Sequence, residues 1–468
     1  MLRRRTKIVA TLGPATDAPE VLDAVVAAGM NCARLNCSHG THDDLRRRAA
    51  SVREAAERAG RPIGLLFDLQ GPKLRLSAQT GAQVLGAGET VVLCGSEGAE
   101  GGRLRVDLPG FAALVTERSQ IVVGDGVPRL AVERVEASDV VARVVSPGAL
   151  GPRKGVNVTF ARPELPAVTE KDVLDLALAA ELGADFVALS FVRSAADIEE
   201  LRARMRDLGS AARVVAKIEK VEAYEHLDEI IAVSDGVMVA RGDYGVEAGV
   251  ARVPLMQKDT IARATQAGKL VITATQMLES MIQAPEPTRA EAADVANAVI
   301  DGSSAVMLSA ETGVGSYPVE AVRAMAEIAE AAEEAPEIHG RARGGEWETA
   351  GGAVMHAAVE LALELDADAL VVPTATGGAP RACAKYRARP AIVAVAHDRR
   401  VADQLTLEWG VYPVLAGVAE TVDEMIEEAL LVARDAAGLP PGATVVLTAG
   451  RRTGTPGGTN LIMVREIP

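Results

Sequence analysis

A chain of 468 residues is longer than the roughly 150 residues of a typical single domain, so more than one domain is expected. Its net charge of −15 argues against general binding to nucleic acid or to anionic membranes. The four cysteines lack metal-binding or disulfide spacing, no apolar run reaches about 18 residues, and the N-terminal segment lacks the apolar core of a signal peptide. These features predict a cytoplasmic protein without a membrane span.

Eight short apolar runs alternate with helical patterns along most of the chain. Within each block the runs begin 22 to 34 residues apart, and this spacing is typical of βα units. Eight such units close into a barrel, so we predict an α/β fold built on a (β/α)8 TIM barrel. The predicted strands are 6–13, 32–39, 63–70, 186–191, 214–219, 236–243, 270–276 and 304–311.

Polar side chains gather where these predicted strands end. In a (β/α)8 barrel the carboxyl ends of the strands meet at one face, where the active sites of this fold lie. We therefore expect one site to which several strands contribute. The residues at the strand ends are Arg34, Asn36, Ser38, His39, Asp68, Ser190, Lys217, Glu219, Gly242, Asp243, Thr275 and Glu311.

The stretch 214–247 holds the strongest of these signals. Lys217 and Glu219 are two residues apart on a predicted strand, which puts both side chains on the same face. Asp243 follows Gly242, whose backbone can turn its N–H toward a bound anion. Two carboxylates, a cation and an anion site suit a divalent metal that holds an oxyanionic substrate. The alternative is an internal salt bridge from Lys217 to Glu219 or Asp243, and the sequence leaves both interpretations open.

Residues 72–154 interrupt the barrel pattern with short alternating segments that Gly and Asp separate. They predict an inserted all-β domain that lies above the site and acts as a lid. An insertion without a functional role is the alternative. Arg153 and Lys154 then return the chain to the barrel, at the hinge or in the cleft.

The last part of the chain predicts a separate regulatory domain over 345–468, which leaves 1–71 and 155–335 for the barrel. Residues 331–351 are polar and contain glycines, as expected for a linker. Strands and helices alternate after it, which predicts an open, mostly parallel α/β domain. Two of its loops are candidate sites for a phosphorylated effector. Their residues are Thr374, Thr376 and Gly377 in one loop and Arg451 and Arg452 in the other.

Several common enzyme classes lack their motifs in this chain. The six histidines form no HExxH pattern, and neither a GxSxG nor a GxxxxGK[ST] motif occurs. Zinc hydrolases, serine hydrolases and P-loop enzymes are therefore not indicated. A barrel with a divalent metal, a reactive lysine and an arginine can instead stabilise an enolate or a phosphoryl group in transfer.

A set of longer motifs resembles the pyruvate kinase family over essentially the whole chain and in the family's order. They are MNCARLNCSHG, DLQGPKLR, KGVN, LPAVTEKD, AKIEK, VMVARGDYGVE, ATQMLESM, PTRAEAADVANAVIDG and MLSAET. The resemblance implies transfer of a phosphoryl group from phosphoenolpyruvate to ADP. The products are ATP and pyruvate, and this reaction is the final step of glycolysis.

The resemblance also implies roles for individual residues. Lys217 and Arg34 would contact the phosphoryl group, and Lys217 would also stabilise the developing enolate. Glu219 and Asp243 would bind Mg2+, with Mn2+ as an alternative metal. The other implied contacts are the substrate with Ser190, Thr275 and the backbone of Gly242 and Asp243, the nucleotide with Asn36, His39, Arg75 and Lys154, and a monovalent cation with Asn36, Ser38 and Asp68.

One stretch departs from the pattern of the potassium-dependent family members. Leu69, Gln70 and Lys73 stand where those members have Thr, Lys and Glu. The ammonium of Lys73 carries the same charge as K+ and can supply the same positive field from within the protein. We therefore expect an enzyme that does not need K+. The alternative is that Lys73 points to solvent and the monovalent site still holds K+.

The family resemblance further implies a homotetramer and a phosphorylated allosteric effector. Two other functions compete with this assignment. The first is a metal-dependent aldolase or lyase that uses Lys217 to stabilise a pyruvate enolate, which leaves the lid and Lys154 unexplained. The second is a non-catalytic regulator that binds metabolites. Such proteins usually lack a catalytic residue, and none is missing from this chain.

Overall fold

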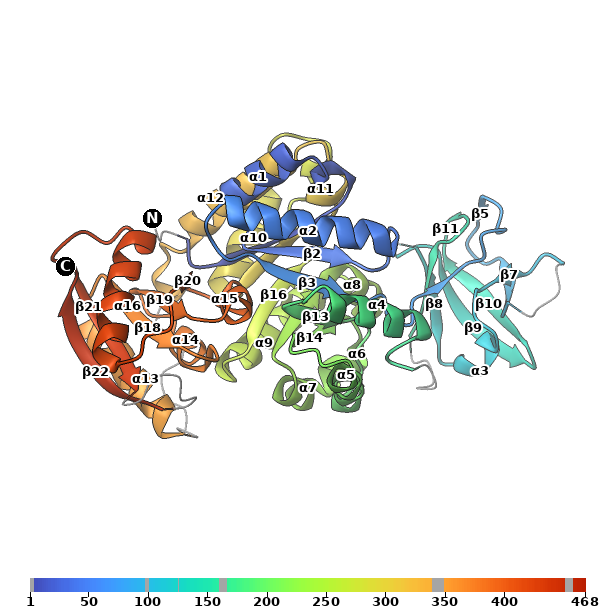
Figure 1. The fold of residues 1–468 in the computed structure, drawn as a ribbon. Helices are drawn as coiled ribbons and strands as arrows, with labels where there is room; N and C mark the ends of the chain where they lie inside the picture. Colours follow the sequence, from blue (N-terminus) through green and yellow to red (C-terminus); the bar gives the residue numbers. More distant parts are fainter. Residues whose placement is uncertain (1–3, 97–100, 125, 160–165, 339–348, 451–457) are drawn as a thin grey trace.

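The computed structural model describes residues 4–96, 101–124, 126–159, 166–338, 349–450 and 458–468. Three bodies follow one another in a row, with the C-terminal domain at one end, a barrel in the middle and a β-rich lid at the other end (Figure 1). Because the barrel lies between the other two bodies, one of its ends faces the lid and the other faces the C-terminal domain.

The predicted barrel is confirmed, with eight parallel strands in the closed order β1-β17-β16-β15-β14-β13-β3-β2. All eight expected strands are present, but most end two or three residues earlier than expected. The reason is local, because the polar residues after the apolar run turn away into loops or helices; Arg241, for example, begins α8. The strands are β1 (Lys7–Thr11), β2 (Cys32–Asn36), β3 (Gly64–Asp68), β13 (Phe186–Leu189), β14 (Arg213–Ile218), β15 (Gly236–Ala240), β16 (Leu270–Ala274) and β17 (Ala305–Leu308).

Helices surround the barrel, and capping boxes fix where several of them begin. Thr41 caps α2, Thr169 caps α4 and Thr288 caps α10, each with an acidic residue three positions on. Within the described ranges, none of the helices combines the length and apolar character needed to cross a bilayer. The barrel helices are α1 (Pro19–Ala28), α2 (His42–Arg58), α4 (Glu170–Glu181), α5 (Ala195–Asp207), α6 (Val221–Glu225), α7 (Leu227–Val233), α8 (Arg241–Ala248), α9 (Val253–Gln266), α10 (Arg289–Asp301), α11 (Ala310–Gly313) and α12 (Pro318–Ala332).

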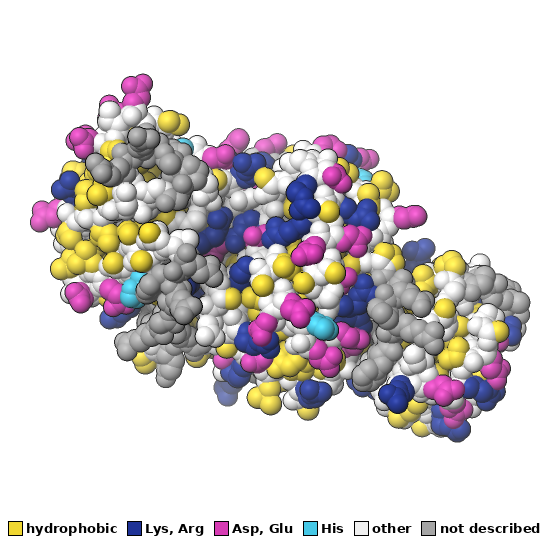
Figure 2. Space-filling model, turned by 90° about the horizontal axis from the view of Figure 1, so that it is seen from below, with side chains coloured by type: hydrophobic (Ala, Val, Ile, Leu, Met, Phe, Trp, Pro, Cys, Tyr) yellow, Lys and Arg dark blue, Asp and Glu magenta, His cyan; other side chains and the backbone are white. Residues whose placement is uncertain are grey.

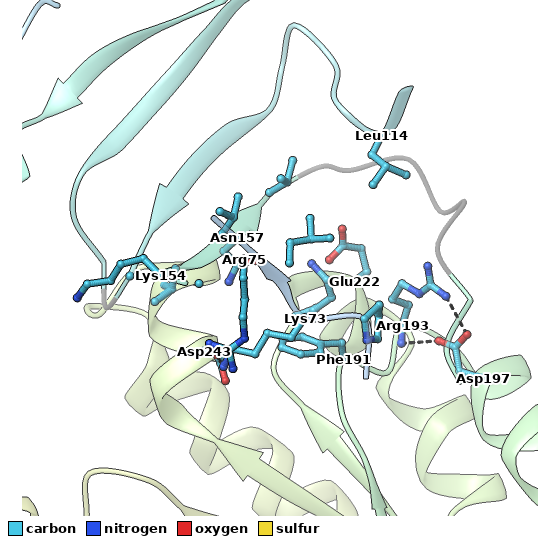
Figure 3. Close-up of a pocket in the computed structure, with 18 of the residues that line it drawn as sticks. Lys73, Arg75, Leu114, Lys154, Asn157, Phe191, Arg193, Asp197, Glu222 and Asp243 are labelled. Carbon is cyan, nitrogen blue, oxygen red and sulfur yellow. Dashed lines mark hydrogen bonds and ion pairs between the residues drawn. The ribbon is translucent and has the colours of Figure 1, made fainter. Parts of the chain in front are cut away.

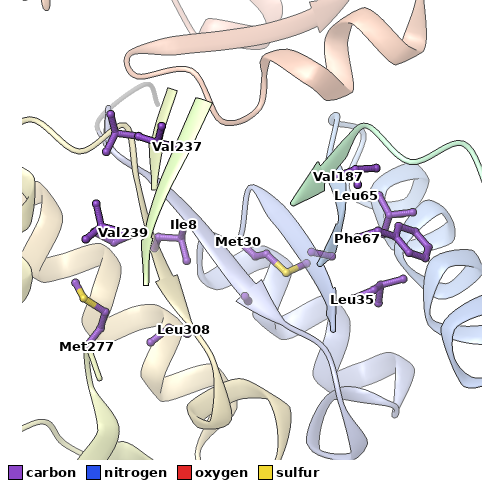
Figure 4. Packing of buried hydrophobic residues seen from close by; sticks show 14 of the residues in the cluster. Ile8, Met30, Leu35, Leu65, Phe67, Val187, Val237, Val239, Met277 and Leu308 are labelled. Carbon is purple, nitrogen blue, oxygen red and sulfur yellow. The ribbon is translucent and has the colours of Figure 1, made fainter. Parts of the chain in front are cut away.

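The period of two along each strand divides its side chains between two apolar layers. Leu65 and Phe67 of β3 point outward and pack against the helices, in the cluster that Figure 4 shows. Leu66 of the same strand points inward and packs with Met238 of β15 in the barrel interior. Because both layers are filled with side chains, the barrel is a packed core and not a pore.

The lid is a curled β-sheet with the strand order β4-β12-β8-β9-β10-β6-β7, beside a two-stranded ribbon of β5 and β11. The sequence prediction missed β9 as a separate strand and also the short helix α3 (Phe111–Leu114). The sheet includes β12, so the last lid strand lies after residue 154, where the lid was expected to end. The strands are β4 (Leu74–Arg75), β5 (Gln83–Leu85), β6 (Thr90–Cys94), β7 (Leu104–Arg105), β8 (Gln120–Val123), β9 (Arg129–Glu136), β10 (Asp139–Ser146), β11 (Gly148–Leu150) and β12 (Gly155–Val158).

The C-terminal domain is a five-stranded α/β sheet with the order β20-β19-β18-β21-β22. Its strands pair in parallel except for β22, which is antiparallel to β21, so the mostly parallel sheet that we expected is present. Its strands are β18 (Ala369–Thr374), β19 (Ala391–Ala396), β20 (Val411–Leu415), β21 (Thr444–Gly450) and β22 (Thr459–Glu466). Its helices are α13 (Ala350–Glu364), α14 (Gly378–Ala384), α15 (Arg399–Leu405) and α16 (Val422–Ala437).

The C-terminal domain closes the amino-terminal end of the barrel. Leu407, in the loop after α15, is fully buried and belongs to the apolar cluster of the barrel interior. The backbone approaches closely at the start of β3, where a Cβ on Gly64 would lie 2.5 Å from Thr406 Oγ1 and 3.1 Å from the Asp403 carbonyl oxygen. The loop after α15 is therefore part of the barrel core and not a flexible tether.

We predict that Leu407→Ala lowers the free energy of unfolding by about 2–5 kcal/mol, because it leaves a cavity at the end of the barrel. Urea unfolding followed by circular dichroism measures this loss. Leu415→Ala is the matched control in the same domain, since Leu415 is 42% exposed and should lose little. An unchanged midpoint for Leu407→Ala would contradict the role of Leu407 in the barrel core.

Candidate active site

A cavity of about 110 Å3 lies at the carboxyl-terminal end of the barrel strands and holds most of the predicted site residues. Several converge because they continue the inward-facing positions of a strand, as Arg34 follows Cys32 and Asp68 follows Leu66; others, such as Asp243 and Thr275, lie in the turns that follow the strands. The predicted residues that line the cavity are Arg34, Asn36, Ser38, His39, Asp68, Gln70, Lys73, Arg75, Ser190, Lys217, Glu219, Asp243 and Thr275.

A wider cleft of about 760 Å3 lies between the barrel and the lid. Both the cavity and the cleft are lined by Lys73, Arg75, Phe191 and Asp243. Figure 3 shows Arg75 and Lys73 extending from the lid side toward Asp243 on the barrel side. The cavity therefore adjoins a space large enough for a second, larger substrate.

Lys217 is the centre of a buried network of charged groups. Its Nζ donates a hydrogen bond to Ser190 Oγ at 2.7 Å and lies 3.0 Å from Glu219 Oε1 and 3.2 Å from Asp68 Oδ1. Arg34 holds the other oxygen of Asp68, with Nε and Nη2 each 2.7 Å from Oδ2. Of the two salt bridges left open by the sequence, the structure contains the one from Lys217 to Glu219.

The network decides which groups carry charge. Burial lowers the pKa of the Lys217 ammonium, but Asp68 and Glu219 outweigh it and raise this pKa above its usual value. Burial also raises the pKa of the Asp68 carboxyl, but Lys217 and Arg34 reverse this shift and leave its pKa below the usual value. Lys217 is therefore a permanent cation at neutral pH.

Glu219 and Asp243 are the two carboxylates that can hold a metal. Glu219 is 1% exposed in its side chain, and its Oε2 accepts a hydrogen bond from the Phe191 N–H at 2.8 Å. Its Oε1 lies 3.0 Å from Lys217 Nζ. Burial, and then the nearby Asp243, raise the pKa of Glu219 against the pull of Lys217.

These two carboxylates fit a divalent cation such as Mg2+. A buried carboxyl whose pKa is raised gains from an added positive charge. No group of three or more metal-binding side chains occurs in the described ranges, so a metal here would depend on water or substrate oxygens for its other ligands.

Asp243 lies in the first turn of α8, directly after β15. Its Oδ1 is 3.9 Å from Lys73 Nζ, and Lys73 lines the cavity with its side chain 33% exposed. The Gly242 N–H, one of the two predicted to receive an anion, donates to Thr275 Oγ1 at 2.9 Å. A substrate carboxylate would therefore have to replace or share this hydroxyl.

Several residues that organise the site were assigned no role from the sequence. Arg241 donates to the backbone carbonyls of Thr275 and Gln276 and pairs with Asp294, and so holds the loop after β16. Thr11 on β1 accepts a hydrogen bond from Arg34 at 2.9 Å. No sequence motif could reveal these contacts, because the partners lie more than twenty residues apart.

Glu311, which the sequence places at the end of the eighth strand, does not line the cavity. Its carboxylate is 2% exposed and accepts the backbone N–H groups of Leu278 and Ser309. Its role in this structure is to hold two loops together.

Two of the nucleotide candidates differ in position. His39 lines the cavity, and burial followed by repulsion from Arg75 lowers its pKa, so its imidazole is neutral at pH 7. Lys154 lines only the wider cleft, where its side chain runs alongside Gly124. It lies in the cleft, one of the two positions that the sequence allowed.

A second pocket, of about 320 Å3, lies in the C-terminal domain. Thr374, Thr376 and Gly378 line it together with Thr349 at the start of α13 and with His397. Gly377 caps α14 with a positive φ of 79°. The other effector candidates, Arg451 and Arg452, lie outside the described residues.

The fold and the site together define a class of protein. A (β/α)8 barrel whose lidded site combines a fixed ammonium, an arginine and two carboxylates is an enzyme site for a small oxyanionic substrate.

Comparisons with known proteins narrow this class. A family described as "Pyruvate kinase, barrel domain" matches residues 3–322, and one described as "Pyruvate kinase, alpha/beta domain" matches residues 352–465. The chain is 42% identical to a pyruvate kinase of Geobacillus stearothermophilus, over 100% of this chain and 81% of that protein. It is 42% identical to one of Mycobacterium tuberculosis, over 100% and 99%. A Clostridium acetobutylicum pyruvate kinase is 36% identical over 99% and 100%. The chain belongs to the pyruvate kinase family and is a glycolytic phosphotransferase.

Proposed function

We propose that the cavity binds phosphoenolpyruvate and that the adjoining cleft binds ADP, so that the phosphoryl group passes from one to the other. The observation that carries this proposal is the Lys217 ammonium, buried and fixed 3.0 Å from one metal-binding candidate, Glu219. A preorganised cation of this kind stabilises the negative charge that develops on oxygen during the transfer.

The side chains around Lys217 suit the groups of phosphoenolpyruvate. Arg34 is held by Asp68 and Thr11 and would bind the phosphoryl oxygens. The backbone N–H groups of Gly242 and Asp243, at the start of α8, would bind the carboxylate. Ser190 accepts a hydrogen bond from Lys217 and would help to keep its ammonium directed at the substrate.

Glu219 and Asp243 would hold Mg2+, or Mn2+ in its place, which neutralises charge on the phosphoryl and enolate oxygens. The chain's own part is to keep both carboxylates on the same cavity as Lys217. Thr275, whose φ of 68° places it in a strained turn after β16, would lie beside the methylene carbon that is protonated.

The nucleotide would occupy the cleft beneath the lid. Asn36 and His39 line the barrel side, and Arg75 on β4 and Lys154 line the lid side. The cations on the lid side, Arg75 and Lys154, suit a polyphosphate, which the lid can enclose and shield from water. We further propose a cytoplasmic homotetramer, in keeping with the family resemblance.

We predict that Lys217→Met keeps the fold but lowers kcat for ATP formation by about 10³-fold, because the cation at the transition state is lost. A coupled assay of ATP with phosphoenolpyruvate and ADP measures this loss, and Arg206→Met at an exposed residue is the control. Near-normal turnover would remove Lys217 from the mechanism. Pyruvate formation without ADP would favour the aldolase or lyase alternative.

We predict that Glu219→Gln and Asp243→Asn each raise the half-saturating Mg2+ concentration at least about tenfold, because each removes one anionic ligand. The double variant should lose metal activation. Titration of activity with Mg2+ and calorimetric titration of Mg2+ binding give two independent measurements. Glu200→Gln, a surface carboxylate that pairs with Arg204, is the control. An unaltered Mg2+ requirement in both single variants would make these carboxylates structural.

We also propose that the enzyme does not need K+. Lys73 Nζ lies 3.9 Å from Asp243 and lines the cavity that contains the monovalent-site candidates Asn36, Ser38 and Asp68. An ammonium in this cavity supports the idea that a fixed side chain takes over the field of a bound cation. Leu69 and Gln70 fit the same loss of a K+ requirement. Neither side chain has a hydroxyl that could bind a cation, and neither carries a charge.

The expected result is equal activity in K+, Na+ and tetramethylammonium chloride at matched ionic strength. Lys73→Glu should lower activity and make the remainder respond to K+, because it restores the acidic residue of potassium-dependent relatives. Arg206→Glu, a similar charge reversal at an exposed residue, should do neither. Strong activation of the parent enzyme by K+ alone would overturn the proposal.

Finally, we propose that a phosphorylated metabolite binds the C-terminal pocket and lowers the half-saturating concentration of phosphoenolpyruvate. Thr374, Thr376 and Gly377 lie between β18 and α14, and the start of α13 faces the same pocket. Backbone N–H groups at helix starts favour anions. Arg451 and Arg452 would add positive charge to this site.

A further inference from the structure

Arg381 on α14 folds back onto the loop 374–378 that begins its own helix. Its Nη1 donates to the Thr376 carbonyl oxygen at 3.0 Å. A Cβ on Gly377 would lie 2.8 Å from Arg381 Nη2, so the guanidinium lies directly against the loop. An anion bound to this loop would therefore lie close to Arg381.

On its other side, Arg381 faces a carboxylate in the loop after α15. Its Nε lies 3.4 Å from Glu408 Oε1 but makes no hydrogen bond within the described residues. The same Glu408 oxygen forms a closer ion pair with Arg213, the first residue of β14, and Glu408 is 7% exposed in its side chain. One buried carboxylate thus pairs with two guanidinium groups, and Arg381 lies farther from it than Arg213 does.

β14 joins this carboxylate to the active site. Arg213, Val215 and Lys217 alternate along the strand and lie on its inward face, and Glu219 follows directly after it. Arg213 is at the end of the barrel that faces the C-terminal domain, and Lys217 and Glu219 are at the end that faces the lid. At about 3.3 Å per residue, this single strand spans the distance between the two ends of the barrel, with no loop in between.

Near this contact, three guanidinium groups, those of Arg213, Arg381 and Arg202, face two carboxylates, those of Glu408 and Asp235. Burial, followed by repulsion from Arg213, lowers the pKa of Arg381 to about 10. Figure 2 shows Lys and Arg side chains gathered where the barrel meets the C-terminal domain. A second anion near Arg381 would relieve this excess of positive charge, and it would compete with Glu408 for the Arg381 guanidinium.

We propose that Arg381, Glu408 and Arg213 form a relay that transmits anion binding at the loop 374–378 to β14, to Lys217 on this strand and to Glu219 directly after it. The proposal rests on the effector function proposed for that loop. Arg381 moves toward the bound anion, Glu408 then pairs with Arg213 alone, and the start of β14 is held in one position. Arg213 and Glu408 are positioning residues, since neither touches the substrate.

The geometry favours this route over a general change in domain docking. Figure 1 shows α14 and α15 on the side of the C-terminal domain that faces the barrel. A second ion pair between the domains joins Asp403 to Arg53 at 3.0 Å, but Asp403 also accepts the N–H of Ile63, next to β3. Asp403 itself contacts neither the loop 374–378 nor β14, and it offers a control at the same interface. Its partner Arg53 also pairs with Asp185, whose carbonyl oxygen accepts the Arg213 N–H.

The test compares Glu408→Gln and Asp403→Asn with the parent protein, using inorganic phosphate, glucose 6-phosphate and AMP as probes. Calorimetric titration measures probe binding, and steady-state kinetics measures the half-saturating phosphoenolpyruvate concentration. In the parent, a bound probe should lower this concentration at least about fivefold. Glu408→Gln should still bind the probe but lose this response, whereas Asp403→Asn should retain it.

Hydrogen exchange of the β14 amides gives a second readout that does not depend on activity. A bound probe should increase the protection of Val214–Ile218 in the parent but not in Glu408→Gln. If Glu408→Gln does not fold, Arg381→Gln replaces it, because Arg381 is 22% exposed and its loss should be tolerated. This variant should bind the probe more weakly and show no response even at saturation.

The outcomes separate the relay from the effector site. Probe binding with a full response in Glu408→Gln would overturn the relay and leave the effector site intact. Loss of the response in Asp403→Asn as well would also overturn it, because domain docking in general would then carry the signal. If none of the three probes binds the parent protein, the effector proposal fails, and the relay fails with it.

Discussion

The arrangement of this protein depends on the neutralisation of buried carboxylates by fixed cations at the mouth of the barrel. Asp68 and Glu219 are almost completely buried, and unpaired charges there would be strongly destabilising. Lys217 lies between the two, and Arg34 completes the set. Because each ion holds the next in place, the site is organised before any substrate arrives. This is the condition under which charged groups stabilise a transition state most effectively.

The barrel uses its two ends for different purposes. The end that faces the lid carries the charged network, and the other end is filled by Leu407 from the C-terminal domain. A strand that spans a packed barrel cannot shift at one end without consequences at the other, since the interior has little free volume. The contact between Arg213 and Glu408 is therefore a place where the C-terminal domain can influence Lys217.

Much of the fold could be predicted from local sequence patterns. The eight barrel strands were found because each is a short apolar run between turn residues, and a polar residue follows on the same face. The prediction was less successful in the lid, where β9 was missed and the sheet runs on through β12. Short, half-exposed strands give weak periodic signals, and only pairing with a neighbour identifies them.

The sequence by itself determined that Lys217 and Glu219 share one face, because that depends only on the period of a strand. It also identified the family, through motifs long enough to be specific. Only the tertiary structure decided that Lys217 pairs with Asp68 as well as Glu219, that Lys73 faces Asp243, and that Leu407 enters the barrel. These contacts join residues far apart in the chain. They arise when the sheet closes and the domains dock, and no local pattern of residues records either event.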